Sequence, residues 1–255
     1  MTRRVKRSAI VSVLFVIVSF MAINIGQQLL FSIRAQAAID NFNARFGPFT
    51  ACGTAGLIEY GADSQSNIGH SYHVQAVSSF LSFFNQASIY MQGQENLLDP
   101  FNYMHPSFNL QRFWLDTDII GYLTIPAIDL ELPVFLGTSH HNLNRGLAHL
   151  THSSFPVGGD NTHAVIAGHR RLHHARVFRD IELLELGDEV RLTNFYQTLI
   201  YTVVETRTIG NGQTYALEIQ SYRDLLTLVT QVSRGVGRSD YRYIVTAERV
   251  VDRRD

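Results

Sequence analysis

Residues 121–126 read GYLTIP, a short alternating segment closed by a proline, and they begin a series of similar segments that continues almost to the end of the chain. Each segment is rich in β-branched or apolar residues and is bounded by turn-forming residues, which is typical of short strands. Pro133 predicts that the second segment lies at a sheet edge or a bulge. One connector, around residues 177–186, has a helical pattern. The chain therefore predicts an all-β barrel or sandwich with little helix. The further strand segments are residues 130–136, 164–167, 189–192, 198–209, 225–230 and 241–250.

Composition narrows the class of protein. The chain has 255 residues, of which 45% are apolar and 17% charged, as in an ordinary globular protein. This length suffices for one domain with a good core plus an anchor. The formal net charge of -1 argues against nucleic acid as a partner, because no basic excess is available to neutralise phosphates. Cys52 is the single cysteine, which excludes an intramolecular disulfide framework and a cysteine-based structural zinc site.

The N-terminus carries a basic cluster followed by an apolar run. Residues 9–23 are apolar, and a weaker continuation reaches Phe31. The whole segment approaches the roughly 20 residues that span a bilayer, and the run lacks a polar face. We expect residues 1–34 to form a cytoplasmic basic tail and an uncleaved signal anchor, which places the rest of the chain on the outer face of the cytoplasmic membrane. A cleaved signal peptide is the alternative, because residues 35–37 (AQA) offer a small-residue site. The basic residues are Arg3, Arg4, Lys6 and Arg7.

Residues 35–116 form a second region, outside the membrane. Gly47 and Pro48 predict a break in any helix there. Residues 73–91 have the spacing of an amphipathic helix, and residues 99–116 are aromatic and irregular. A loop with that much aromatic surface is expected to pack on another part of the protein. The remaining residues, 117–255, are expected to form the β domain.

Several ordered motifs follow one another in residues 95–250. They are residues 121–126, 132–134, 137–139 (GTS), 146–150 (GLAHL), 153–159 (SSFPVGG), 161–170 (NTHAVIAGHR), 226–230 (LTLVT) and 248–250. In this order they resemble the motifs of the sortase family. The resemblance implies a closed β-barrel with short helices, preceded by a transmembrane helix and a helical segment. It also implies that His169 and Arg242 are the catalytic histidine and arginine, with Gly168 and Thr230 as candidates for the substrate groove.

Residues 99–101 (DPF) narrow the resemblance to class C sortases, which assemble pili. In that class an Asp-Pro-aromatic lid lies over the active site. The resemblance implies that Asp99 pairs with Arg242 and that Phe101 covers the nucleophile. Asp-Pro is also a common turn pair, so an ordinary turn is the plainer alternative.

The resemblance also implies a reaction. Sortases cut a sorting-signal peptide of the LPxTG type between Thr and Gly, and they pass the acyl group to an amine. A thiolate attacks the carbonyl to form a thioester, a histidine transfers protons, and an arginine stabilises the oxyanion. In this chain the position of the cysteine is held by Gln231. A glutamine amide is not a usable nucleophile, because its nitrogen lone pair is delocalised into the carbonyl.

Loss of the nucleophile commonly lowers the rate of a covalent mechanism by about a million-fold, or roughly 8 kcal/mol. Three hypotheses follow. The chain is a class C sortase-family protein with a severely impaired transpeptidase step, or a binding module that captures sorting signals or pilins or supports an active sortase, or an enzyme with another nucleophile such as Cys52. The plainer interpretation of His169 is an ordinary loop histidine, and that of Arg242 is a solvent-facing strand residue.

Further histidines raise the question of a metal site. Adjacent histidines rarely point the same way, and no helical i, i+4 pair occurs among them. We therefore interpret them as surface or loop residues and expect neither a metal nor a cofactor. They are His140, His141, His149, His152, His163, His173 and His174.

Overall fold

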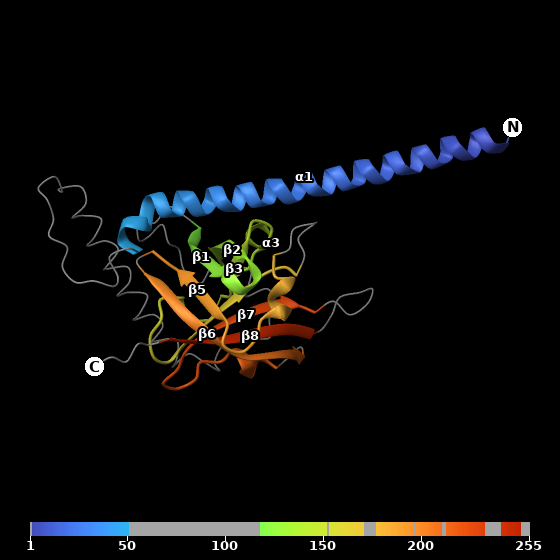
Figure 1. Ribbon diagram of the computed structural model, residues 1–255. Coiled ribbons are helices and arrows are strands. Elements are labelled where there is room, and N and C mark those ends of the chain that lie inside the picture. Colours follow the sequence, from blue (N-terminus) through green and yellow to red (C-terminus); the bar gives the residue numbers. More distant parts are fainter. Residues whose placement is uncertain are drawn as a thin grey trace, which may run out of the picture.

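A closed barrel with one long helix beside it makes up the described part of this computed structural model (Figure 1). The structure describes residues 2–50, 118–151, 153–170, 177–195, 197–210, 213–232 and 241–250, with the backbone alone for residues 2–12, 47–50 and 214. The expected lid residues Asp99 and Phe101, and the helix expected at residues 73–91, lie outside the described residues.

Eight strands form the barrel in the order β1-β2-β3-β4-β7-β8-β6-β5, and β5 closes onto β1. The β2–β3 and β4–β7 pairs are parallel, and the others are antiparallel. Of the two β architectures that the sequence allows, the barrel is therefore the one formed. The strands are β1 Ile119–Ile125, β2 Leu130–Leu136, β3 Leu147–His149, β4 Thr162–Ala167, β5 Glu189–Thr193, β6 Thr198–Gly210, β7 Asp224–Gln231 and β8 Tyr241–Arg249.

Two local features differ from the sequence-based expectation. The three-residue strand β3 was not predicted, because a segment so short carries no readable alternation. Within the connector expected to be helical, the described part contains only a 3-10 turn, η4 (Asp180–Leu183). The other short helical turns are η3 (Pro126–Ile128), α3 (His140–Leu143) and η5 (Thr214–Leu217).

Two residues show how the sequence permits closure. Gly121 lies where β1 meets β5, and a Cβ atom there would stand 2.1 Å from the carbonyl oxygen of Thr193. Only glycine allows the two strands to approach this closely. Pro133 pairs with Tyr122 on β1, whereas the β3 ladder on its other side begins only at Val134. The proline therefore occupies a place with a ladder partner on one side only, which agrees with the expected edge-like position.

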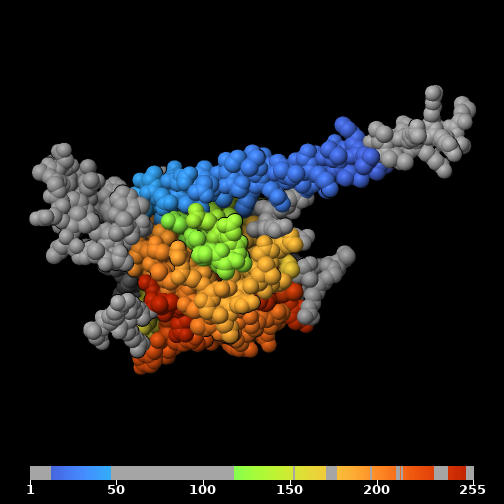
Figure 2. Space-filling model, viewed as in Figure 1, coloured from blue at the N-terminus to red at the C-terminus, as the bar shows by residue number. Residues whose placement is uncertain are grey.

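Helix α1 (Thr2–Thr50) has an exposed part and a docked part. The segment Val13–Phe46 contains a stretch long and apolar enough to cross a membrane, and that stretch has no buried side chain. The first buried side chain among those described is Ala35. From Ala35 the helix buries one face against the barrel, and Figure 2 shows its C-terminal, lighter blue part lying on the barrel surface. The fully docked residues are Ala35, Ile39, Phe42 and Phe46.

An aromatic cluster joins α1 to the barrel. The ring of Phe42 lies 5.7 Å from that of Phe195 and 6.0 Å from that of Tyr122, and Phe46 lies 5.0 Å from Phe195. The helix continues past Gly47–Pro48 to Thr50, so the break predicted at this pair is wrong. The reason is positional: a proline in the last turn forfeits a single helical hydrogen bond, and the docking of Phe42 and Phe46 stabilises the turns before it.

Candidate functional site

Three neighbouring strands bring the sequence-predicted site residues to one end of the barrel. Gln231 is the last residue of β7 and is the direct cross-strand partner of Arg242 on β8. On the other side of β7, Ala167 at the end of β4 pairs with Val229. The amide of Gly168 donates to the carbonyl of Val229 at 3.1 Å, which extends this pairing beyond the strand. His169 therefore comes level with Gln231.

Directly opposed residues of a sheet share a face, so the register identifies the surface around Gln231. Ile209 on β6, Arg242 and Gln231 form one row across the strands. Two residues further along, in the next row on the same face, Ile244 lies opposite Val229. Ile209, Ile244 and Val229 pack with Ala216 of η5 in a small apolar cluster separate from the main core. Ile209, Ala216 and Ile244 are buried in this cluster, and Val229 is its partly exposed member next to the polar end residues.

The turn that carries His169 is held by the strand beside it. A Cβ atom on Gly168 would lie 2.6 Å from the ring of Phe178 and 2.8 Å from the side chain of Leu147, so the turn closes only around glycine. The hydroxyl of Thr230 donates to the carbonyl of Gly168 at 2.9 Å, and the amide of Phe178 donates to the carbonyl of His169 at 2.9 Å. Thr230 and Gly168 are both buried. They tie β7 to the turn of His169, and their contact with a peptide stays a prediction.

The electrostatics of this end are set by two imidazoles and a guanidinium. His169 is half-buried, and burial lowers its pKa from 6.5, with a further lowering from the positive charge of His140. The two rings lie 6.4 Å apart at an interplanar angle of 73°. Arg242 is half-buried, and its Nη1 donates to the carbonyl of Tyr241 at 3.3 Å. Gln231 is exposed at the end of its strand. Cys52 lies outside the described residues.

The neighbour of His169 was missed at the level of sequence. The sequence shows His140 as half of a histidine pair and predicts a surface or loop residue. It is exposed, as expected, and it lies on α3, which follows β2. No local pattern could reveal its approach to His169, because the approach depends on how the β2–β3 connection packs against the end of β4.

Two other histidines contradict the expectation that all of these are surface or loop residues. His149 on β3 and His163 on β4 are fully buried. His163 donates from Nδ1 to the carbonyl of Glu218 at 2.7 Å, and its Nε2 accepts from the hydroxyl of Thr227 at 2.7 Å. His149 donates from Nε2 to the carbonyl of Ser154 at 2.9 Å. Both ring nitrogens of His163 therefore have a partner, whereas the buried Nδ1 of His149 has none among the described residues. His152, His173 and His174 lie outside the described residues.

Burial governs the protonation of both rings. It lowers the pKa of His149 from 6.5 to about 4, although the hydrogen bond to the Ser154 carbonyl opposes the shift. Burial lowers the pKa of His163 to about 4 as well; the hydrogen bond to the Glu218 carbonyl opposes this shift, and the charge of Arg223 adds a smaller lowering. Both rings are therefore uncharged at neutral pH, and they stabilise the fold as hydrogen-bonding groups.

Asp224, which the sequence did not single out, organises the opposite end of β7. Its carboxylate accepts from the amide of Gly159 at 2.8 Å, from the hydroxyl of Thr162 at 3.1 Å and from the hydroxyl of Tyr201 at 3.1 Å. These bonds join the start of β7 to the start of β4 and to β6. Asp224 is therefore a structural residue that fixes the register of the strands ending at the candidate site.

Comparison with known proteins agrees with this geometry. A family model described as the sortase domain matches residues 123–250, about half of the chain. The chain belongs to the sortase family. Sortase D of Bacillus subtilis is 34% identical over 131 residues, a match that covers 51% of this chain and 63% of that protein. At the level of sequence the chain thus spans less than two thirds of the length of its curated relatives.

Solved sortase structures cover more of the chain, and they are sortases of class C. Sortase C of Clostridium perfringens, solved with the C-terminal cell wall sorting motif, gives a TM-score of 0.63 at 25% identity, and the match covers 85% of this chain and 100% of that chain. Sortase C of Streptococcus pneumoniae gives a TM-score of 0.63 at 25% identity, with 84% of this chain and 97% of that chain covered. The closed barrel of this protein is thus a sortase barrel of the class C type.

Proposed function

We propose that this protein is a membrane-anchored class C sortase-family protein that binds a sorting-signal peptide and has a severely impaired transpeptidase step. The observation that carries the proposal is the position of Gln231. It ends β7 level with His169 and directly opposite Arg242. The family resemblance assigns this position to the catalytic cysteine. A pseudoenzyme that captures sorting signals or pilins, or supports an active sortase, is the role that such a site leaves open.

The surroundings of Gln231 support binding without a covalent step. Arg242 offers guanidinium N–H donors for a peptide carbonyl, and a guanidinium is always charged at physiological pH. Val229, the partly exposed member of the small apolar cluster, lies two residues before Gln231 and offers an apolar contact for a side chain of an LPxTG-type peptide. Neither feature requires a thiol. The thioester does require one, and its loss lowers the rate by about a million-fold.

The anchor places this site outside the cell in the proposal. A basic tail precedes an apolar segment of α1, and tails of this kind remain cytoplasmic. Because α1 is continuous into its docked part, the barrel is held close to the membrane surface. Asp99 and Phe101 complete the proposal as a lid over the site, with Asp99 facing Arg242.

The test compares the full chain in detergent micelles with its Gln231→Cys variant. A quenched LPxTG-type peptide reports cleavage, and a labelled peptide reports binding by fluorescence anisotropy. We expect binding by both proteins and cleavage only by the cysteine variant. Cleavage by the wild type at a rate near that of the variant would overturn the proposal. If Cys52→Ala abolished such an activity, Cys52 would be the nucleophile. Absence of peptide binding by both proteins would remove the binding role.

A further inference from the structure

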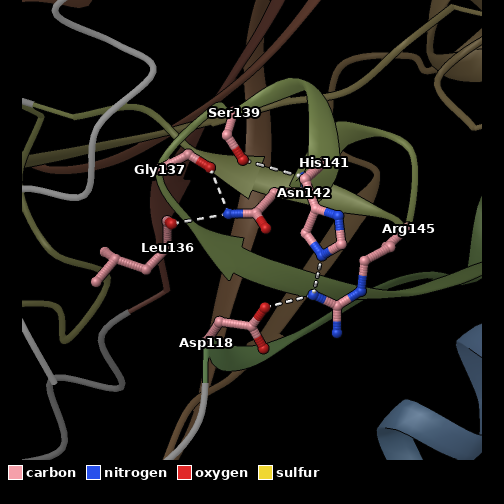
Figure 3. Close-up of polar contacts among 7 residues, drawn as sticks. All are labelled: Asp118, Leu136, Gly137, Ser139, His141, Asn142 and Arg145. Atoms are coloured by element: carbon pink, nitrogen blue, oxygen red, sulfur yellow. Dashed lines mark hydrogen bonds and ion pairs between the residues drawn. The ribbon is translucent and has the colours of Figure 1, made fainter. Parts of the chain in front are cut away.

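The turn that carries His140 is fastened to the barrel (Figure 3). The buried Asn142 donates from Nδ2 to the carbonyls of Leu136 and Gly137, at 2.9 Å each. Ser139 caps the turn by accepting from the amide of Asn142 at 3.2 Å. A side-chain amide that donates both of its N–H groups to two successive carbonyls fixes the orientation of its own backbone. α3 is therefore a rigid support for the residues at its start.

The two adjacent histidines of this turn point to different partners. Figure 3 shows His141 directed at Arg145, whose Nη1 lies 3.2 Å from its Nε2 and also pairs with Asp118. His140 instead places its ring 6.4 Å from that of His169, at 73°. Successive residues of a helical turn are about 100° apart, so one turn serves both directions. His141 is thus a matched control for His140.

The titratable and charged side chains around His169 come from three parts of the fold. Arg170, the next residue along the chain, forms an ion pair with Glu182, with Nη2 3.0 Å from Oε2. From β8, Arg242 stands opposite Gln231. From α3 the titratable group against the ring of His169 is His140, whose positive form opposes a positive charge on His169.

We propose that His140 is a positioning residue that acts through His169, steadying its ring and opposing its protonation from a turn fixed to the barrel. The consequence for the peptide site rests on the function proposed above. With His169 uncharged at neutral pH, the site presents a neutral imidazole beside the fixed charge of Arg242. A neutral imidazole does not stabilise a neighbouring thiolate, because a thiol pKa falls next to a positive charge and not next to a neutral ring. His140 therefore suits a site that binds peptide without a thiolate.

The direct test is an NMR titration of the imidazole carbons in the full chain in detergent micelles, without peptide and with a chelator present. His169 is assigned from a His169→Asn sample. We expect the pKa of His169 to lie below 6.5 in the wild type, to rise toward 6.5 in His140→Gln, and to stay low in His140→Lys, which retains a positive charge. His141→Gln should leave it unchanged, because that ring faces Arg145.

The outcomes separate charge from packing. An unchanged pKa of His169 in His140→Gln would overturn the proposal. An equal rise in His140→Gln and His140→Lys would also overturn it, since burial by the His140 ring would then be the whole effect. No peptide is present, so the result does not depend on the proposed function. A second readout uses Gln231→Cys with Cys52→Ala: adding His140→Gln should speed alkylation of the new thiol by iodoacetamide at pH 7, and an unchanged or slower rate would contradict the inference.

Discussion

Mild acid is expected to destabilise the barrel through His149 and His163. Each has a pKa near 4 in the folded protein and 6.5 as its ordinary value. As the pH falls, the unfolded chain therefore takes up a proton before the folded chain does, and unfolding becomes more favourable. The loss of unfolding free energy is close to zero at pH 7.5, grows as the pH falls through 6.5, and is complete below about pH 4. At pH 5 each histidine accounts for about 2 kcal/mol, and the two together for about 4 kcal/mol.

The assay is urea unfolding of the full chain in a non-ionic detergent, followed by near-ultraviolet circular dichroism at pH 7.5 and pH 5. His163→Gln should lower the unfolding free energy at pH 7.5, because hydrogen bonds to Glu218 and Thr227 are weakened. Between pH 7.5 and pH 5, the unfolding free energy of His163→Gln should fall by about 2 kcal/mol less than that of the wild type. His141 is exposed, so the unfolding free energy of His141→Gln should fall between pH 7.5 and pH 5 as much as that of the wild type. Equal losses in His163→Gln and the wild type would refute the reasoning.

Three further changes test the fold around the site. Phe42→Ala should lower the unfolding free energy by about 3–5 kcal/mol in urea titrations, because it empties the cluster that joins α1 to the barrel, whereas the exposed Phe20→Ala should leave it unchanged. Asp224→Ala should cost about 3 kcal/mol or more in the same titration, since three donors lose their acceptor. Gly168→Ala should lower peptide cleavage by the Gln231→Cys protein about tenfold, because its methyl group displaces the turn of His169; Gly210→Ala, where the nearest atom lies 3.8 Å from a Cβ, should not. Full cleavage by the Gly168 variant would show that the turn tolerates the shift.

The fold was predictable from the sequence to the extent that its strands are long enough to alternate. Runs of β-branched and apolar residues predict β6 and β7 nearly to their ends. β3 was not, because three residues carry no period. The barrel itself, as against a sandwich, followed from the family resemblance, since closure depends on long-range features such as the fit of Gly121 against Thr193.

The candidate site was predictable only in its sequence-local parts. Motifs on β4, β7 and β8 located His169, Gln231 and Arg242, and the register brings their positions together. The approach of His140 and the burial of His163 were not predictable. Both depend on which loop covers which strand. The sequence around a single histidine does not distinguish an exposed ring from a buried ring with hydrogen-bond partners.

The most direct test of the central claim is the intact mass of the full chain after incubation with an LPxTG-type peptide. The Gln231→Cys variant, carrying Cys52→Ala, should gain the mass of the acyl group as a thioester that hydroxylamine removes. Wild-type protein should gain no mass while still binding the labelled peptide. An acyl adduct on the wild type, or no adduct on a cysteine variant that binds the peptide, would contradict the claim that position 231 is the nucleophile position of this sortase barrel.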